Sequence, residues 1–151
     1  MVTSNKVLFF VLATVLISFS SHAKNNVNSK EFGDYIVLFN TLPSNFLSPD
    51  IAKRYNLTRS RNRILLNIVV KKKTTGDKAK PVQAKVNAIA TNLTGQLKKT
   101  TMRAIHDGTG IYYLGEFSVA NAERLNFKVD VTPKAGNKTY VVTFKKKFMI
   151  K

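Results

Sequence analysis

Arginine is concentrated in one short stretch of the chain, where it could recognise an anion. Four of the six arginines fall within ten residues, namely Arg54, Arg59, Arg61 and Arg63. A guanidinium group binds a carboxylate or phosphate through paired hydrogen bonds, and the loop at 58–61 could add backbone N–H donors. The alternative interpretation is that these arginines tie the loop to the rest of the fold. The stretch is therefore a candidate binding loop.

Side chains for catalysis are sparse. Of two histidines, His22 lies in an N-terminal segment that we expect to be removed, and His106 stands beside Asp107. A histidine oriented by a carboxylate could act as a base, but no motif places a nucleophile near it. An exposed turn histidine is the simpler interpretation, so we expect no catalytic residues.

Metal and cofactor chemistry is also poorly supported. The chain has no cysteine and only eight acidic residues, which are scattered along it. Met102 and Met149 fit core or edge positions better than copper sites. Because no glycine-rich phosphate-binding motif is present either, we expect no metal and no cofactor.

The chain carries a large positive charge. Its formal net charge is +17, from 19 lysines and six arginines against eight acids. Lysine is a flexible point charge, so this excess suits a general positive field better than a built phosphate site. Such a field favours anionic neighbours such as lipid headgroups, acidic polysaccharides or acidic proteins. A compositional bias without a function is the alternative.

The N-terminus predicts export. Lys6 precedes an apolar run at 7–19, and small residues at Ser21 and Ala23 favour cleavage after Ala23. We expect 1–23 to be a cleaved signal peptide and 24–32 a flexible lead-in. The protein would then be periplasmic, with no transmembrane span left. The alternative is an uncleaved anchor, for which a run of 13 residues is short.

Local patterns predict strands around one short helix. A strand at 35–40 should end in a turn that contains Pro43. Ser48 can cap a helix, with Pro49 at its first position and Asn56 as a left-handed terminator. The near-continuous apolar run at 63–73 predicts a central strand.

The second half of the chain predicts plainer strands. Asp107-Gly108 predicts a hairpin of 96–106 with 110–119, which would place Met102 opposite Tyr113 and Lys99 opposite Glu116. Alternation indicates further strands at 82–90, 127–132 and 140–145, with a basic tail at 145–147.

Aromatic and basic residues interleave near the C-terminus, which could resemble a nucleic-acid stacking face. Alternation places Tyr140, Phe144 and Phe148 on one side, so a core face is favoured and no nucleic acid is expected. Seven short strands and one helix predict a single antiparallel β-sandwich domain over 33–151, immunoglobulin-like in architecture. A small closed barrel is the runner-up.

Ordered motifs along the chain resemble a known family. They are GDY at 33–35, NTLP at 40–43, FLSP at 46–49, Tyr55, RS at 59–60, LLNI at 65–68, NLTGQ at 92–96, IYY at 111–113 and EF at 116–117. The chain is similar to the family of domain of unknown function 4426 (DUF4426). The resemblance implies a small exported protein of Gram-negative bacteria and a periplasmic location. It implies no activity, because no catalytic residues are established for that family.

Three classes of function follow. We expect a non-enzymatic periplasmic module that binds a protein or a cell-envelope component, through one face or through the arginine loop. A binder of polyanions or membrane surfaces is the first alternative. The second is an enzyme with an unrecognised site near Asp34, Asn40 and Arg61.

Overall fold

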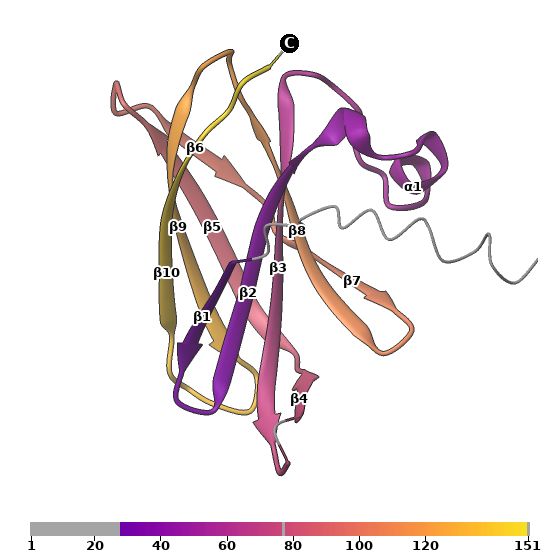
Figure 1. Ribbon diagram of the computed structural model, residues 1–151, viewed down its shortest axis with the longest axis vertical. Helices are drawn as coiled ribbons and strands as arrows, with labels where there is room; N and C mark the ends of the chain where they lie inside the picture. Colours follow the sequence, from indigo (N-terminus) through magenta and orange to yellow (C-terminus); the bar gives the residue numbers. More distant parts are fainter. Residues whose placement is uncertain (1–27, 77, 151) are drawn as a thin grey trace, which may run out of the picture.

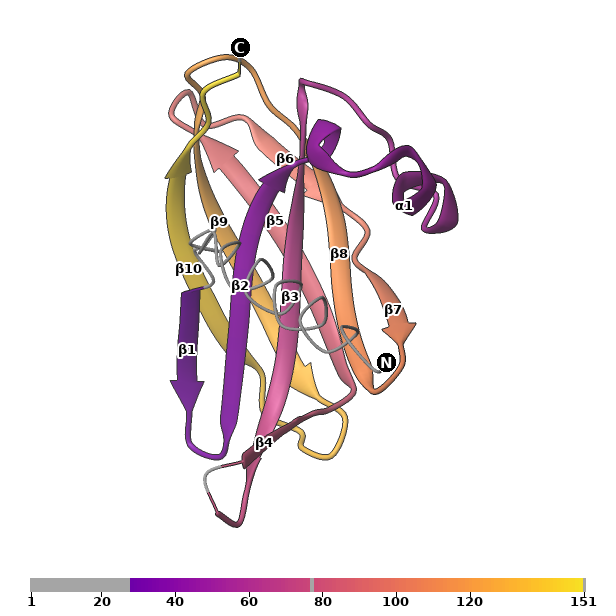
Figure 2. The same ribbon diagram turned by 45° about the vertical axis from the view of Figure 1, so that its right-hand side comes forward.

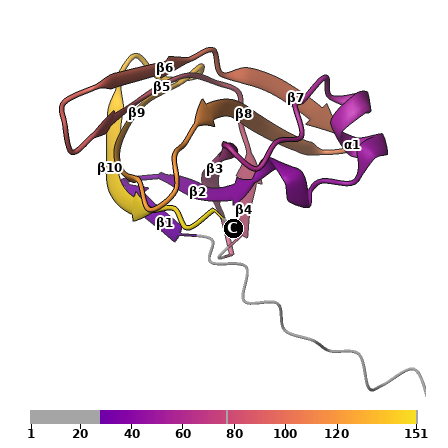
Figure 3. The same cartoon turned by 90° about the horizontal axis from the view of Figure 1, so that it is seen from above.

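Two antiparallel sheets face each other and form a β-sandwich (Figures 1 and 3). The computed structural model describes residues 28–76 and 78–150, and within them it holds ten strands. The six-stranded sheet contains β1 (Asn28–Phe32), β2 (Tyr35–Pro43), β3 (Arg63–Thr74), β4 (Lys78–Pro81), β7 (Arg103–Asp107) and β8 (Gly110–Ser118). The four-stranded sheet contains β5 (Ala84–Asn92), β6 (Leu97–Thr100), β9 (Arg124–Pro133) and β10 (Tyr140–Lys147).

The two facing sheets confirm the predicted fold class, an antiparallel β-sandwich. Immunoglobulin-like domains are also built as β-sandwiches. The predicted number of seven strands is too low, because β1, β4 and the division of 96–106 into β6 and β7 were missed. The runner-up barrel is wrong, since the two sheets remain separate hydrogen-bonded ladders in the described residues. A 3₁₀ turn, η1 (Ser44–Phe46), and the helix α1 (Pro49–Arg54) connect β2 to β3.

The core lies between the sheets and is built by alternation. Every second side chain of β9 is buried, from Leu125 through Val131, and the buried side chains of β3, β5 and β8 meet them. As predicted, β3 is central, with β2 on one side and β8 on the other. The opposite face of β3 buries Leu65 against Ala52 and Leu57, so the strand is covered on both faces near α1.

An aromatic column fills the centre of the core. The ring of Phe144 stacks between Phe39, at a centroid distance of 4.7 Å, and Phe127, at 4.6 Å. Phe148 is buried beside Phe127 in an edge-to-face contact. The C-terminal aromatic residues are therefore core, as alternation predicted, rather than a stacking surface.

Two boundaries near the N-terminus need correction. Residues 28–32 of the expected flexible lead-in form β1, which pairs along its whole length with β2. β2 itself continues to Pro43 instead of ending at Asn40. Proline is accepted there because β1 no longer pairs with this part of β2, so no donor is missed on that edge. The expected signal peptide, the cleavage after Ala23 and residues 24–27 lie outside the described residues.

The predicted hairpin register is wrong, because the two central residues of the turn lie one position later in the chain than expected. Asp107 pairs with Gly110, so Gly108 rather than Asp107 takes the first central position, with a positive φ of 56°. Ala104 therefore faces Tyr113. Lys99 pairs with Ile89 in the other sheet and not with Glu116.

Pairs in the predicted hairpin that involve 97–100 fail for a topological reason. The chain leaves the four-stranded sheet after β6 and enters the six-stranded sheet as β7, so 96–106 is two strands in two layers. Figure 2 shows β7 splayed to the side of β8, beneath α1. Across the described part of the chain, no helix has the length and hydropathy needed to cross a membrane.

Candidate functional site

A small pocket opens at the end of the sandwich where β2 and β10 finish and β3 begins. Its volume is about 230 Å³, and its lining combines six apolar residues with two polar ones. The apolar residues are Pro43, Phe46, Ile64, Phe148, Met149 and Ile150. The polar residues are Asn45 and Arg61. We call this cavity the end pocket.

Ser44 holds one wall of the end pocket in place. Its side chain is fully buried at the start of η1. The Oγ atom donates to the carbonyl of Ser60 and accepts from the N–H of Ser60, both at 3.0 Å. Arg59 Nη2 adds a bond to the Asn45 carbonyl at 3.3 Å. These bonds clamp η1 to the 57–62 loop and so place Phe46 next to Arg61.

α1 is fixed as its sequence predicts. The Ser48 side chain accepts from the N–H of Ile51, Pro49 starts the helix, and Asn56 ends it with a positive φ of 49°. The outer side of the helix end is held by Arg103 of β7, whose Nη1 donates to the carbonyls of Tyr55 and Asn56 at 3.1 and 3.2 Å. A cation at this position satisfies carbonyls that a helix C-terminus leaves free.

The opposite wall of the end pocket is the C-terminal segment after β10. The N–H of Phe148 bonds to the Glu123 carbonyl at 2.8 Å, and the N–H of Ile150 bonds to Asn121 Oδ1 at 3.0 Å. Phe148 is buried, whereas 66% of Met149 is exposed. The backbone is therefore anchored on both sides of Met149 while its side chain remains accessible.

Glu123 anchors the turn that holds this segment. Its carboxylate accepts from Lys98 Nζ at 2.7 Å, from the Ala120 N–H at 2.8 Å and from Asn92 Nδ2 at 3.1 Å. Desolvation alone would raise the pKa of Glu123, but these hydrogen bonds and the charge of Lys98 outweigh it. The pKa of Glu123 is consequently lowered.

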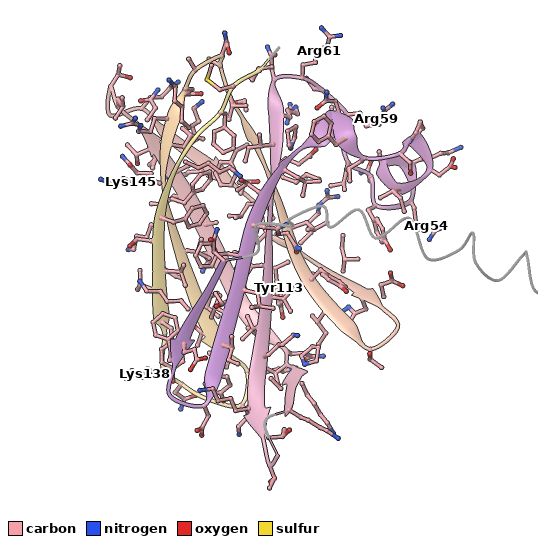
Figure 4. All side chains as sticks on the ribbon, in the orientation of Figure 1. Arg54, Arg59, Arg61, Tyr113, Lys138 and Lys145 are labelled. Atoms are coloured by element: carbon pink, nitrogen blue, oxygen red, sulfur yellow. The ribbon has the colours of Figure 1, made fainter. Side chains whose placement is uncertain are left out.

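The four predicted arginines do not converge on one anion. Figure 4 places Arg59 and Arg61 at the end of the sandwich and Arg54 on α1, away from the end pocket. Arg63 is half-buried and opens β3 opposite Ser118. Within the described residues none of the four forms an ion pair with a carboxylate. Arg59 ties the loop down and Arg61 lines the end pocket, and the binding loop stays a prediction.

The three residues of the alternative enzyme site do not lie close together. Asp34 lies in the β1–β2 turn, at the end of the sandwich opposite Arg61, and Asn40 lies between them on β2 (Figures 1 and 4). His106 is exposed near the hairpin tip and lines a separate, open groove with Tyr113 and Lys85. The Tyr113 hydroxyl there accepts from the N–H of Ala84 at 2.7 Å. In the described residues, no three His, Cys, Asp or Glu side chains gather as a metal site would need.

The end pocket suits an apolar group that carries a negative charge close by. Its walls offer apolar surface, and Arg61 offers at the rim a guanidinium that pairs with no carboxylate of residues 28–76 and 78–150. The volume is below the roughly 300–1,000 Å³ typical of small-molecule sites, so one or two protein side chains fit it better than a cofactor. Phe46, with 76% of its surface exposed, and Met149 stand at its mouth.

Sequence reasoning missed Ser44, Phe46 and Met149 as site residues. Phe46 begins the resemblance motif FLSP at 46–49, but nothing in the sequence distinguishes an exposed loop phenylalanine from a core one. Met149 was expected at the core or an edge. The contact of 43–46 with 148–150 joins segments about a hundred residues apart, which no local pattern reveals.

Comparisons with known proteins agree with this fold. The model of a family described as a domain of unknown function, DUF4426, matches residues 29–151. A crystal structure of a DUF4426 family protein from Pseudomonas aeruginosa is similar, with 28% identity and a TM-score of 0.73 over 86% of this chain and 99% of that one. No functionally curated protein matches the chain.

Two structures of FetP from uropathogenic Escherichia coli strain F11 are more distant. One has 11% identity and a TM-score of 0.59, over 81% of this chain and 93% of that one. A copper-bound FetP variant has 10% identity and a TM-score of 0.57, over 82% and 90%. At such identity the likeness shows a shared fold alone.

Proposed function

We propose that this chain, which belongs to the DUF4426 family, is an exported, non-enzymatic module that binds a protein partner through the end pocket. The exposed apolar mouth beside Arg61 is the observation that carries the proposal. Exposed aromatic and arginine side chains around an apolar pocket are typical of the residues that contribute most to protein binding.

The chemistry of the end pocket defines the partner group. An apolar side chain would enter between Phe46 and Met149, and a neighbouring carboxylate would pair with Arg61. A chain terminus or an acidic loop can present this combination. Because η1 and the C-terminal segment are both anchored by hydrogen bonds, the pocket is preorganised and little ordering entropy is lost on binding.

A periplasmic location is part of the proposal. It is supported by the leader at 1–23, with its charged start, apolar run and small residues before the cleavage position. FetP, which shares the fold, was expressed in the periplasm for its structure determination.

The copper of the FetP variant is not extended to this chain. The shared identity is 10%, and the described residues contain no gathered set of metal-binding side chains. The single histidine they include, His106, lies on the exposed hairpin, and the chain has no cysteine. These donors do not fit a copper site.

Cross-linking and affinity capture from the native periplasm test the proposal. The pocket variant is Phe46→Ser with Arg61→Ala. The matched control is Ile51→Ser with Arg54→Ala, which removes one exposed apolar residue and one arginine from α1. We expect a specific protein to be captured by the wild type and the control but not by the pocket variant. Equal capture by both variants, or no specific capture by the wild type, would contradict the proposal.

A further inference from the structure

The outer face of the four-stranded sheet gathers positive charge. Strand register places alternate residues of β5, β6, β9 and β10 on this face, opposite to the buried row. Six of these residues are basic and one is acidic, a net charge of +5. The basic residues are Lys85, Lys99, Arg124, Lys128, Lys145 and Lys147, and the acid is Asp130. We call this surface the basic face.

The outer face of the six-stranded sheet shows that this charge is not a uniform bias. The same register argument gives it four basic and three acidic residues, a net charge of +1. They are Arg63, Lys71, Lys73 and Arg103 with Glu31, Asp107 and Glu116. The charge is therefore segregated between the two sides of one sandwich.

The cations of the basic face are mostly unneutralised. Lys128 lies 3.8 Å from Asp130, and in the described part of the chain none of the other five comes within 4.0 Å of a carboxylate oxygen. Lysines on an edge strand such as β10 can simply prevent edge-to-edge pairing. That explanation does not cover Lys85 and Lys128, which stand on β5 and β9 inside the sheet.

A shallow depression lies in the middle of the basic face, with a volume of about 400 Å³. Thr91, Asn126 and Lys145 cross it in one row, and Ile89, Lys128 and Thr143 in the next. The Oδ1 atom of Asn126 is buried there with no hydrogen-bond donor among the described residues. Two ammonium groups, two hydroxyls and an unpaired amide oxygen are suited to a phosphate group that carries a hydroxylated or amine substituent.

We propose that the basic face binds the surface of a bilayer that contains anionic phospholipid, with one headgroup in this depression. Five of the six cations are lysines, whose mobile point charges suit a fluid array of phosphates better than a fixed protein surface. Val141 and Leu97, with 41% and 49% of their surface exposed, stand among these cations and can reach the headgroup layer. Figure 4 shows Lys145 on this side of the molecule, away from Arg61 and the end pocket, so both surfaces can be occupied together.

Vesicle sedimentation tests this proposal on the full chain. The face variant is Lys128→Gln, Lys145→Gln and Lys147→Gln. The matched control is Lys53→Gln, Lys78→Gln and Lys80→Gln, which removes three exposed lysines of α1 and β4. All the proteins share residues 1–27, so differences among them report the substituted surfaces. Thermal unfolding of each variant confirms that it is folded.

We expect binding to phosphatidylglycerol-containing vesicles but not to phosphatidylcholine vesicles, with a loss of affinity at high salt. The face variant should bind at least about tenfold more weakly than the control, since each cation near an anionic surface contributes to binding. At high salt, where the diffuse electrostatic attraction is screened, the Asn126→Ala variant should bind these vesicles more weakly than the wild type does.

Three results would overturn the inference. Equal loss in the face and control variants would show that only net charge matters. Binding to polyglutamate without binding to vesicles would indicate an acidic protein as the partner. If the Asn126→Ala variant bound vesicles at high salt as well as the wild type does, the depression would not be a headgroup site. None of these variants alters the end pocket, so failure here is distinguishable from failure of the protein-binding proposal.

Discussion

The Oγ atom of Ser44 exchanges two hydrogen bonds of 3.0 Å with the backbone of Ser60, sixteen residues later in the chain. This one buried hydroxyl joins the 3₁₀ turn after β2 to the loop before β3. It therefore fixes the spacing between Phe46 and Arg61 across the mouth of the end pocket.

Replacing Ser44 should loosen the end pocket and destabilise the fold. Ser44→Ala leaves the N–H of Ser60 without its partner in a partly buried setting, while the Ser60 carbonyl keeps only the N–H of Arg63 at 3.4 Å, and this loss costs about 1–3 kcal/mol. Chemical denaturation measures this loss in the free energy of unfolding. Ser118→Ala is the control, because that exposed serine makes no side-chain hydrogen bond among the described residues, and it should change stability little. A neutral Ser44→Ala variant would show that the clamp is dispensable.

Acid should weaken the anchor at Glu123. Its pKa is lowered in the folded state from an ordinary value of 4.5, so its stabilisation is present above that value and is lost as the pH falls through the folded pKa. The wild type should exceed Glu123→Gln in unfolding free energy at pH 6, and the difference should shrink towards pH 3. Urea unfolding at both pH values measures this. A difference that is constant with pH would exclude Glu123 as a titrating anchor.

Gly115 of β8 permits the crossing from β6 to β7. A Cβ atom at this position would lie 2.5 Å from Met102 Sδ and 2.7 Å from Thr100 Cγ2. Gly115→Ala should force the crossing away from β8 and lower the unfolding free energy by about 1–3 kcal/mol. Thermal denaturation checks this. Ala104→Gly in β7 is the control, because it also exchanges a methyl group and a hydrogen but does so at a more exposed strand position. A fully stable Gly115→Ala variant would mean that the crossing adjusts without cost.

The same crossing explains what the sequence could not reveal. Alternation along β9 and the cap at Ser48 report local burial and local hydrogen bonds, and both were predicted correctly. The passage of the chain between sheets at 101–102 brings Thr100 and Met102 close to Gly115 of another strand, an approach that leaves no local pattern in the sequence. The core position of Phe144 and Phe148 was predicted because both residues are in phase with the buried face, but their stacking against Phe39 and Phe127 was not.

The candidate functional site, too, could be predicted from the sequence only in part. The concentration of arginines can be read from the sequence. The structure adds that Arg59 is used to hold the loop against η1, whereas Arg61 is accessible at the end pocket. The exposure of Phe46 and Met149 depends on clamps made by Ser44 and Glu123, which join remote segments. The basic face required the strand register before its lysines could be assigned to one side.

Site-specific photo-cross-linking tests the central claim most directly. A photoreactive residue replaces Phe46 at the mouth of the end pocket. In the control it replaces Tyr112, an aromatic residue on the outer face of the six-stranded sheet that is 38% exposed. Irradiation of living cells should give a discrete protein adduct from position 46 but not from 112, and Arg61→Ala should abolish it while Arg54→Ala leaves it intact. The same adducts from both positions, or none from position 46, would contradict a protein-binding role for the end pocket.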